Sequence, residues 1–260
     1  MTALSKLKYV LATIFFLVIC VLTTAFQANI NTAYDVVVLN FTFAALFMCA
    51  FLFGGIPTGI AGVLGVCLYI LLKNQSAWLA LLGLVIGLVF GIITKLTTIL
   101  IDNKKLDKKA LLISAGAFFI GMGLVFTTAR ACFGSYYIEK STEIFVRFYW
   151  PQYVLTYIIG ALFILAAIFI DKLKENLTQV ACISAFVSTS AICLYGIVCI
   201  LCSIKNTTFA GTLAKAYSTY FMNFSISIIV GLLIAFAIYA IGYIAIEVRI
   251  KIKNMLKDAE

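Results

Sequence analysis

The chain has 260 residues, of which 64% are hydrophobic and only 11% are charged. A typical soluble domain is about half apolar and about a quarter charged, so a soluble chain of this size could not bury so much apolar surface. The absence of histidine excludes histidine-based zinc sites, haem ligation by histidine and Ser–His catalysis. The composition therefore predicts an all-α, polytopic transmembrane helix bundle.

Eight apolar segments are long enough, or nearly so, to cross a bilayer as helices, which takes about 20 residues. The third is short and follows the uncharged run Gly54-Gly55-Ile56-Pro57-Thr58, so the second and third could instead form a tight helical hairpin or a broken helix. We expect a single membrane domain over residues 1–260 with six to eight spans. In chain order the segments are 9–26, 36–53, 59–72, 78–101, 110–129, 153–170, 180–204 and 221–246.

The basic residues predict the orientation of these spans. With the N-terminus on the cytoplasmic side, the cytoplasmic segments hold twelve basic residues and the outer segments hold six. This bias follows the positive-inside rule. The net charge of +9 is therefore interpreted as an orientation signal, and we expect no nucleic-acid partner. Both termini are predicted to be cytoplasmic, in a multi-pass protein of the plasma or inner membrane.

The two halves of the chain share short matches in the same order. Phe-Phe at 15–16 precedes Thr-Thr-Ala at 23–25, and Phe-Phe at 118–119 precedes Thr-Thr-Ala at 127–129. Such matches suggest a weak repeat of four spans plus four, over 1–108 and 109–260, as some transporters have. Chance is the alternative, because short apolar peptides recur easily in such a chain.

Small residues recur at helical spacing from Gly55 into the third segment and again in the fourth segment. Glycines four residues apart lie on one helix face and let two backbones approach closely in a bilayer. Two interpretations follow: packing within the chain, or a surface on which another membrane subunit docks. The glycines concerned are Gly55, Gly59, Gly62, Gly83, Gly87 and Gly91.

Polar residues are scarce, so their positions indicate where a ligand could bind. Lys95 lies about two turns from the cytoplasmic end of its span, where its side chain can snorkel to the interface. The outer segment 130–152 is chemically the most diverse, and its aromatic and polar mixture suits either a small-molecule pocket or an interfacial aromatic belt. The candidate solute-binding residues are Asn40, Arg130, Tyr136, Tyr137, Glu139, Arg147, Trp150 and Gln152.

Enzymatic chemistry is not expected. Membrane acyl, phosphoryl and prenyl transfer need paired acids, histidine or a metal, and the chain has no Asp-x-x-Asp and no Gly-x-Ser-x-Gly. Seven of the eight cysteines fall in the apolar spans and Cys132 lies near an outer helix end; all eight are interpreted as small, buried packing residues. We therefore expect no catalytic residue, no cofactor and no metal site.

One stretch, residues 43–95, contains AALFMCAFLFGGIPTGIAGVLGVCLYILL and then LALLGLVIGLVFGIITK. It resembles the first half of the substrate-binding S components of energy-coupling-factor vitamin importers. The resemblance implies a vitamin-like solute, with transmembrane and ATPase partner subunits that supply the energy. The chain departs from that family in its number of spans. Within residues 43–95 the docking motif Ala-x-x-x-Ala is also missing, and Ala45 and Cys49 are the nearest approximation.

These observations leave two functions open. The first is a solute-binding subunit of a membrane importer. The second is a non-transporting membrane protein, such as a sensor, an immunity or assembly factor, or a subunit of a larger membrane complex.

Overall fold

The computed structural model describes residues 3–25, 27–31, 36–72, 77–134, 150–204 and 222–257. Helix α1 (Ala3–Ala25) is followed by an antiparallel hairpin of β1 (Gln27–Asn31) and β2 (Val36–Asn40). The helices after the hairpin are α2 (Thr42–Phe53), α3 (Gly55–Leu72), α4 (Ala77–Asp102), α5 (Lys108–Gly134), α7 (Trp150–Ile168), the short 3-10 helix η2 (Ile170–Lys172), α8 (Glu175–Ile204) and α10 (Met222–Lys257).

The predicted helical fold is confirmed, and each of the eight predicted segments contains a helix. One boundary is wrong: residues 36–40 form strand β2, paired with β1 in a register that joins Gln27 to Asn40 and Asn31 to Val36. The run Val36-Val37-Val38-Leu39 is apolar, but β-branched side chains favour extended backbone. As a result α2 has only 12 residues, a length of about 18 Å.

A single residue separates α2 from α3. Gly54 has φ +79° and ψ −169°, a conformation that glycine adopts without steric cost. Pro57 lies in the first turn of α3, where its missing N–H breaks no helical hydrogen bond. The Thr58 hydroxyl donates to the carbonyl of Gly54 at 2.7 Å. This glycine–proline sequence therefore ends one helix and starts the next.

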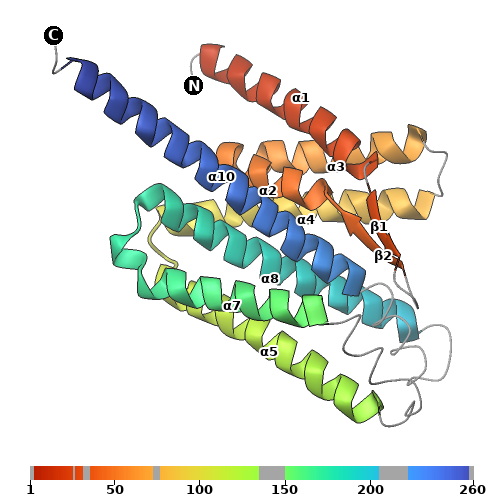
Figure 1. The fold of residues 1–260 in the computed structure, drawn as a ribbon. Helices are drawn as coiled ribbons and strands as arrows, with labels where there is room; N and C mark the ends of the chain where they lie inside the picture. The colour runs from red at the N-terminus through yellow and green to blue at the C-terminus, as the bar shows by residue number, and fades with distance from the viewer. Residues whose placement is uncertain are drawn as a thin grey trace.

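Helix α8 lies at the centre of the bundle, in contact with α4, α5 and α10 (Figure 1). Around it, α3 packs against α1 and α4, α5 packs against α7, and α2 packs against α10. The α2–α10 contact is close, because a Cβ at Gly231 would lie 2.8 Å from the backbone nitrogen of Ala44 and from the Cβ of Phe43. The first and last parts of the chain thus share one core.

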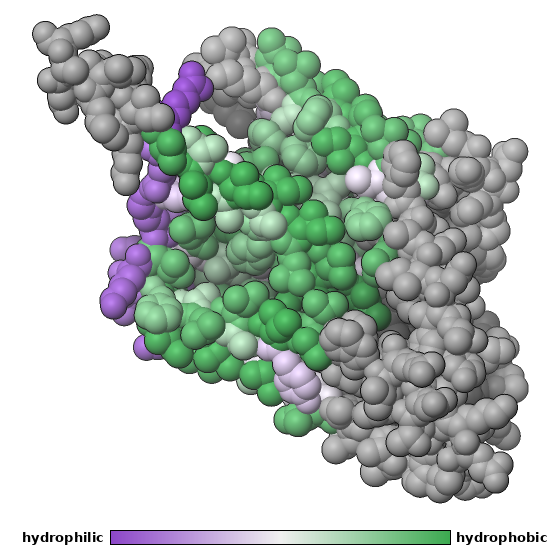
Figure 2. All heavy atoms as spheres, in the orientation of Figure 1, coloured by the Kyte–Doolittle hydropathy of each residue, from purple (hydrophilic) through white to green (hydrophobic). Residues whose placement is uncertain are grey.

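The exposed surface of the bundle is apolar. Large aliphatic side chains recur every three or four residues along the outward faces of several helices, and Figure 2 shows them covering most of the described face. In a soluble protein such aliphatic stripes face the core. In this bundle they face outward, so the usual arrangement is inverted. The stripes include Leu7, Leu11, Ile14, Val18 and Leu22 on α1, Ile56, Ile60, Leu64, Leu68 and Leu71 on α3, and Val154, Ile158, Leu162, Leu165 and Ile168 on α7.

Hydroxyl groups, by contrast, are buried inside. Ser184 and Ser188 of α8 are fully buried, and their hydroxyls donate to the carbonyls of Val180 at 2.7 Å and Ser184 at 2.6 Å. The hydroxyls of Thr24 on α1 and Thr42 on α2 form a hydrogen bond of 2.6 Å between helices. Buried polar groups need hydrogen-bond partners within the protein where water does not reach them. These hydroxyls are therefore paired in the interior, whereas the buried hydroxyls of Thr94 and Ser225 have no hydrogen-bond partner among the described residues.

Two described helices contain segments long and apolar enough to cross a membrane, Glu175–Ile197 of α8 and Phe224–Ile250 of α10. Shorter apolar helical segments are Tyr9–Ala25, Thr42–Phe53, Gly55–Gly65 and Val154–Ile168. The described side chains of α8 and α10 differ in their surroundings: α8 is largely enclosed by neighbours, whereas α10 is exposed from Ala237 onward except at a few positions.

Charged residues gather at one end of the bundle. The connection from α4 to α5 and the connection from α7 to α8 lie there, on the side where both termini are found in Figure 1. Figure 2 shows the strongly hydrophilic residues of this face at the same end. We call this the charged end; its residues include Asp102, Lys104, Lys105, Asp107, Lys108, Lys109, Asp171, Lys172, Lys174 and Glu175.

Candidate functional site

Three of the predicted solute-binding residues, Arg130, Trp150 and Gln152, lie on described helix ends opposite the charged end. Contacts of Gly116 with Gly160 and of Gly123 with Thr156 show that α5 and α7 are antiparallel. The last turns of α5, with Arg130, and the first turn of α7, with Trp150 and Gln152, therefore lie at the same end of the pair. The side chains of these three residues and of Asn40, at the end of β2, lie outside the described part, as do Tyr136, Tyr137, Glu139 and Arg147 altogether.

The small-residue positions form a close contact between α3 and α4. A Cβ at Gly55 would lie 2.3 Å from the carbonyl oxygen of Gly91, and one at Gly91 would lie 2.5 Å from the Cα of Gly59. A Cβ at Gly62 would lie 2.8 Å from the Cα of Gly87. The two backbones touch directly, which is the geometry that glycines at this spacing allow. Gly83 lies farther along α4, and its surroundings are outside the described residues.

Ala45 and Cys49 lie on α2 in the interior of the bundle. Their exposed fractions are 4% and 0%, and both belong to the main core cluster with Phe47 and Leu46. The other described cysteines show that burial is not general: Cys20 and Cys182 are buried, Cys67 is partly exposed and Cys193 is exposed. The expectation of buried cysteines is therefore wrong for Cys193.

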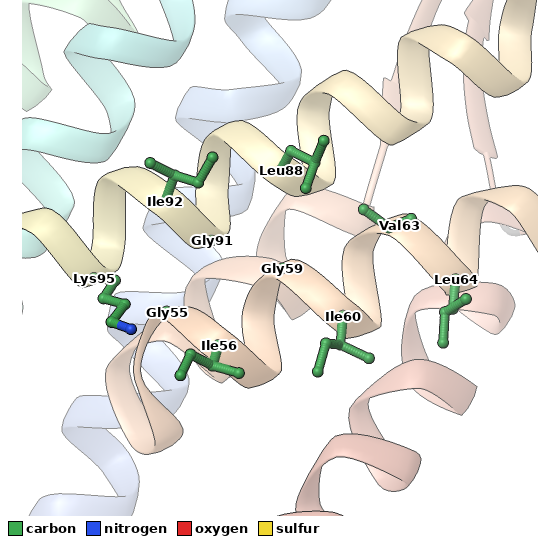
Figure 3. A pocket seen from close by; sticks show the side chains of 10 residues that line it. All are labelled: Gly55, Ile56, Gly59, Ile60, Val63, Leu64, Leu88, Gly91, Ile92 and Lys95. Atoms are coloured by element: carbon green, nitrogen blue, oxygen red, sulfur yellow. The ribbon is translucent and has the colours of Figure 1, made fainter.

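A groove of about 430 Å³ follows the α3–α4 contact on the outer surface of the bundle (Figure 3). We call it the α3–α4 groove. Its floor is made of glycines, which leave space between aliphatic side chains on either side. One cation, Lys95, lies at the end next to the first turn of α3, and none of the lining residues is acidic. The lining residues are Gly55, Ile56, Gly59, Ile60, Val63, Leu64, Leu88, Gly91, Ile92 and Lys95.

The side chain of Lys95 is exposed. In Figure 3 it extends from α4 toward the start of α3, close to Gly55. Within the part of the chain that the structure describes, the single ion pair is between Lys174 and Glu247, so the Lys95 ammonium has no carboxylate partner there. Sequence reasoning found this lysine but had no signal for its position beside Gly55, which depends on how α3 and α4 pack.

Two other hollows differ in chemistry. One, of about 520 Å³, is lined by apolar residues of α7, α8 and α10, including Leu162, Phe163 and Phe236. The other, of about 720 Å³, lies at the charged end between the α4–α5 connection and η2, with both acidic and basic residues such as Asp102, Lys108 and Asp171. Neither combines an apolar track with one unpaired charge, as the α3–α4 groove does.

An ion pair connects two helices at the charged end. Lys174, just before α8, donates to the carboxylate of Glu247 on α10, and the Tyr243 hydroxyl donates to the same Glu247 oxygen at 3.0 Å. The Lys174 ammonium also lies 5.2 Å from the centre of the Tyr243 ring. The hydrogen bond to Glu247 raises the pKa of Lys174 above its ordinary value. Because Lys174 is exposed, this contact is a surface link between α8 and α10.

The described residues include no group of three or more Cys, Asp or Glu residues placed to hold a metal ion. Comparison with protein families, with curated proteins and with solved structures returns no match.

Proposed function

We propose that this chain is a multi-pass integral membrane protein whose eight described helices are embedded in a bilayer. The observation that carries the proposal is the inverted surface: aliphatic stripes face outward on α1, α3 and α7, while hydroxyls such as those of Ser184 and Ser188 are buried. A surface of this kind is stable in lipid, where exposed aliphatic side chains cost nothing, and aggregates in water.

The orientation follows from the charged end. Lysines of the α4–α5 connection, together with Lys172 and Lys174, lie on the side where both termini are found, and the positive-inside rule assigns such an end to the cytoplasm. We propose that both termini are cytoplasmic. Helix α2, at about 18 Å, is shorter than the roughly 30 Å hydrocarbon core. It therefore reaches only part of the way across and continues into α3.

Two experiments test this placement. The protein should stay in the membrane pellet after extraction at alkaline pH. Green fluorescent protein fused after Glu260 should fluoresce, whereas alkaline phosphatase at the same position should be inactive. Release into the soluble fraction would contradict membrane insertion, and an active phosphatase fusion would contradict the orientation.

Within that placement, we propose that the chain is the solute-binding subunit of an importer, with a vitamin-like solute and partner subunits that include an ATPase. The support is the resemblance of residues 43–95 and the polar and aromatic residues of segment 130–152. Helix α5 ends and helix α7 begins opposite the charged end, and segment 130–152 lies between them in the sequence. Solute capture from outside would take place there.

Uptake of radiolabelled vitamins by cells that express the chain, with and without a partner ATPase module, tests the transport role. Arg147→Ala and Trp150→Ala should reduce uptake, and Lys104→Ala, at the charged end, is the matched control. Absence of both uptake and a co-purified solute would overturn the role. It would favour the alternative of a non-transporting subunit of a larger membrane complex.

A further inference from the structure

We propose that the α3–α4 groove binds an anionic phospholipid, with one acyl chain along the glycine floor and the phosphate on Lys95. The inference rests on the proposed membrane location but not on the transport role. It combines three properties of the groove: its shape, its single charge and its position on the surface.

The shape suits a hydrocarbon chain. Ile56, Ile60 and Leu64 of α3 form one side of the groove, and Leu88 and Ile92 of α4 form the other. The span from Ile56 to Leu64 is eight residues, or about 12 Å, close to the roughly 15 Å of hydrocarbon in one leaflet. The floor is low because Gly55, Gly59 and Gly91 have no side chains there. A flexible acyl chain is therefore thin enough to enter the groove. Another helix would be too wide and would rest on the two aliphatic ridges.

The charge specifies the headgroup. An ammonium in or near hydrocarbon is costly unless it reaches the interface or meets an anion, and Lys95 has no acidic neighbour among the groove residues. The Lys95 ammonium attracts a phosphate and repels the choline or ethanolamine ammonium of a zwitterionic lipid.

The position favours a lipid over a soluble anion. Ile60 and Ile92 are 43% and 56% exposed, so the groove opens sideways from the bundle over most of its length. Lys95 is seven residues before Asp102 at the charged end, about 10 Å along the helix. A lysine side chain at this depth snorkels toward the headgroups. A lipid of the cytoplasmic leaflet therefore presents its phosphate to Lys95 and its chain to the groove.

Native mass spectrometry of the purified full-length protein, after incubation with phosphatidylglycerol or phosphatidylcholine of identical chains, tests the proposal. We expect preferential retention of phosphatidylglycerol. Lys95→Gln should lower its retention about tenfold, as loss of one charge-assisted contact implies, and Lys95→Arg should preserve it. Lys104→Gln, which removes an equal charge away from the groove, should have no effect. Equal retention of both lipids, or full retention by Lys95→Gln, overturns the proposal.

A second measurement does not depend on those variants. A phosphatidylglycerol with a photoreactive acyl chain should label wild-type peptides from α3 and α4. Ile92→Trp should reduce this labelling, whereas Ile158→Trp, at a similarly exposed position on α7 (43% exposed), should not. Labelling confined to α7 and α10 would overturn the assignment. If the protein were not retained in membranes at all, the proposed membrane location would fail first.

Discussion

Substitution of Gly91 by alanine probes the contact on which the α3–α4 groove is built. The added Cβ would lie 2.5 Å from the Cα of Gly59, 2.9 Å from its backbone nitrogen and 2.9 Å from the carbonyl oxygen of Gly55. All three neighbours are backbone atoms, which cannot rotate away. At Gly59 itself, a Cβ would lie 3.4 Å from the Cα of Gly91 and 3.7 Å from the Gly87 carbonyl oxygen, which is ordinary contact.

The two variants should therefore differ, although they change the same interface by one methyl group. For Gly91→Ala, ordinary carbon contact at about 3.5 Å requires the helices to separate by about 1 Å. Overpacking of this kind costs about 1–3 kcal/mol, and we expect the upper part of that range. For Gly59→Ala and for Gly121→Ala, where nothing lies within 4 Å, the higher helix propensity of alanine contributes up to about 1 kcal/mol of stability.

The assay is equilibrium unfolding of the purified protein in mixed micelles with increasing sodium dodecyl sulfate. The midpoint should fall clearly for Gly91→Ala and should stay unchanged or rise for Gly59→Ala and Gly121→Ala. If Gly91→Ala unfolds at the same midpoint as Gly121→Ala, the close contact between α3 and α4 is refuted. If Gly59→Ala is as damaging as Gly91→Ala, the asymmetry derived from the geometry is wrong.

Three further predictions concern hydrogen bonds and charge. A double-mutant cycle with Thr24→Val and Thr42→Val should show a coupling of about 0.6 kcal/mol in the same assay; additive effects would show that the 2.6 Å contact contributes nothing. Thr94→Val should stabilise the protein by about 1 kcal/mol, because the buried Thr94 hydroxyl has no hydrogen-bond partner among the described residues; a loss would reveal one. Glu247→Gln should lower the pKa of Lys174 toward its usual value, since Glu247 raises it. The raised pKa means that the ion pair stabilises the fold at neutral pH and is lost as the pH rises through the Lys174 pKa. Chemical labelling of the Lys174 amine, measured by mass spectrometry, should therefore begin at lower pH in the variant than in the wild type.

Hydropathy predicts most of the helices because a bilayer-length apolar run has few other stable forms. The predicted segment 78–101 and helix α4 (Ala77–Asp102) agree within one residue at each end. The error at residues 36–40 has a physical cause: an apolar run shows no period that separates helix from strand when every side chain is hydrophobic. β-Branched composition was the available signal there, and it favoured the strand.

The candidate sites were predictable to different degrees. Glycine spacing predicted a close-packing face on α4, but spacing along one helix says nothing about which helix meets that face. The contact of Gly91 with Gly55 and Gly59 depends on the tertiary packing of α3 against α4. The same holds for Lys95, whose position at the end of an apolar groove arises only once α3 lies against α4.

The contact between α2 and α10 has a consequence for biosynthesis. Phe43 and Ala44 leave the ribosome well before Gly231, which packs directly against them. At 5–20 residues per second, roughly 190 residues of further synthesis take on the order of ten to forty seconds. During that interval the short helix α2 lacks its final neighbour. In the proposed membrane placement, a membrane insertase or chaperone is suited to keep α2 from mispairing until α10 has been synthesised.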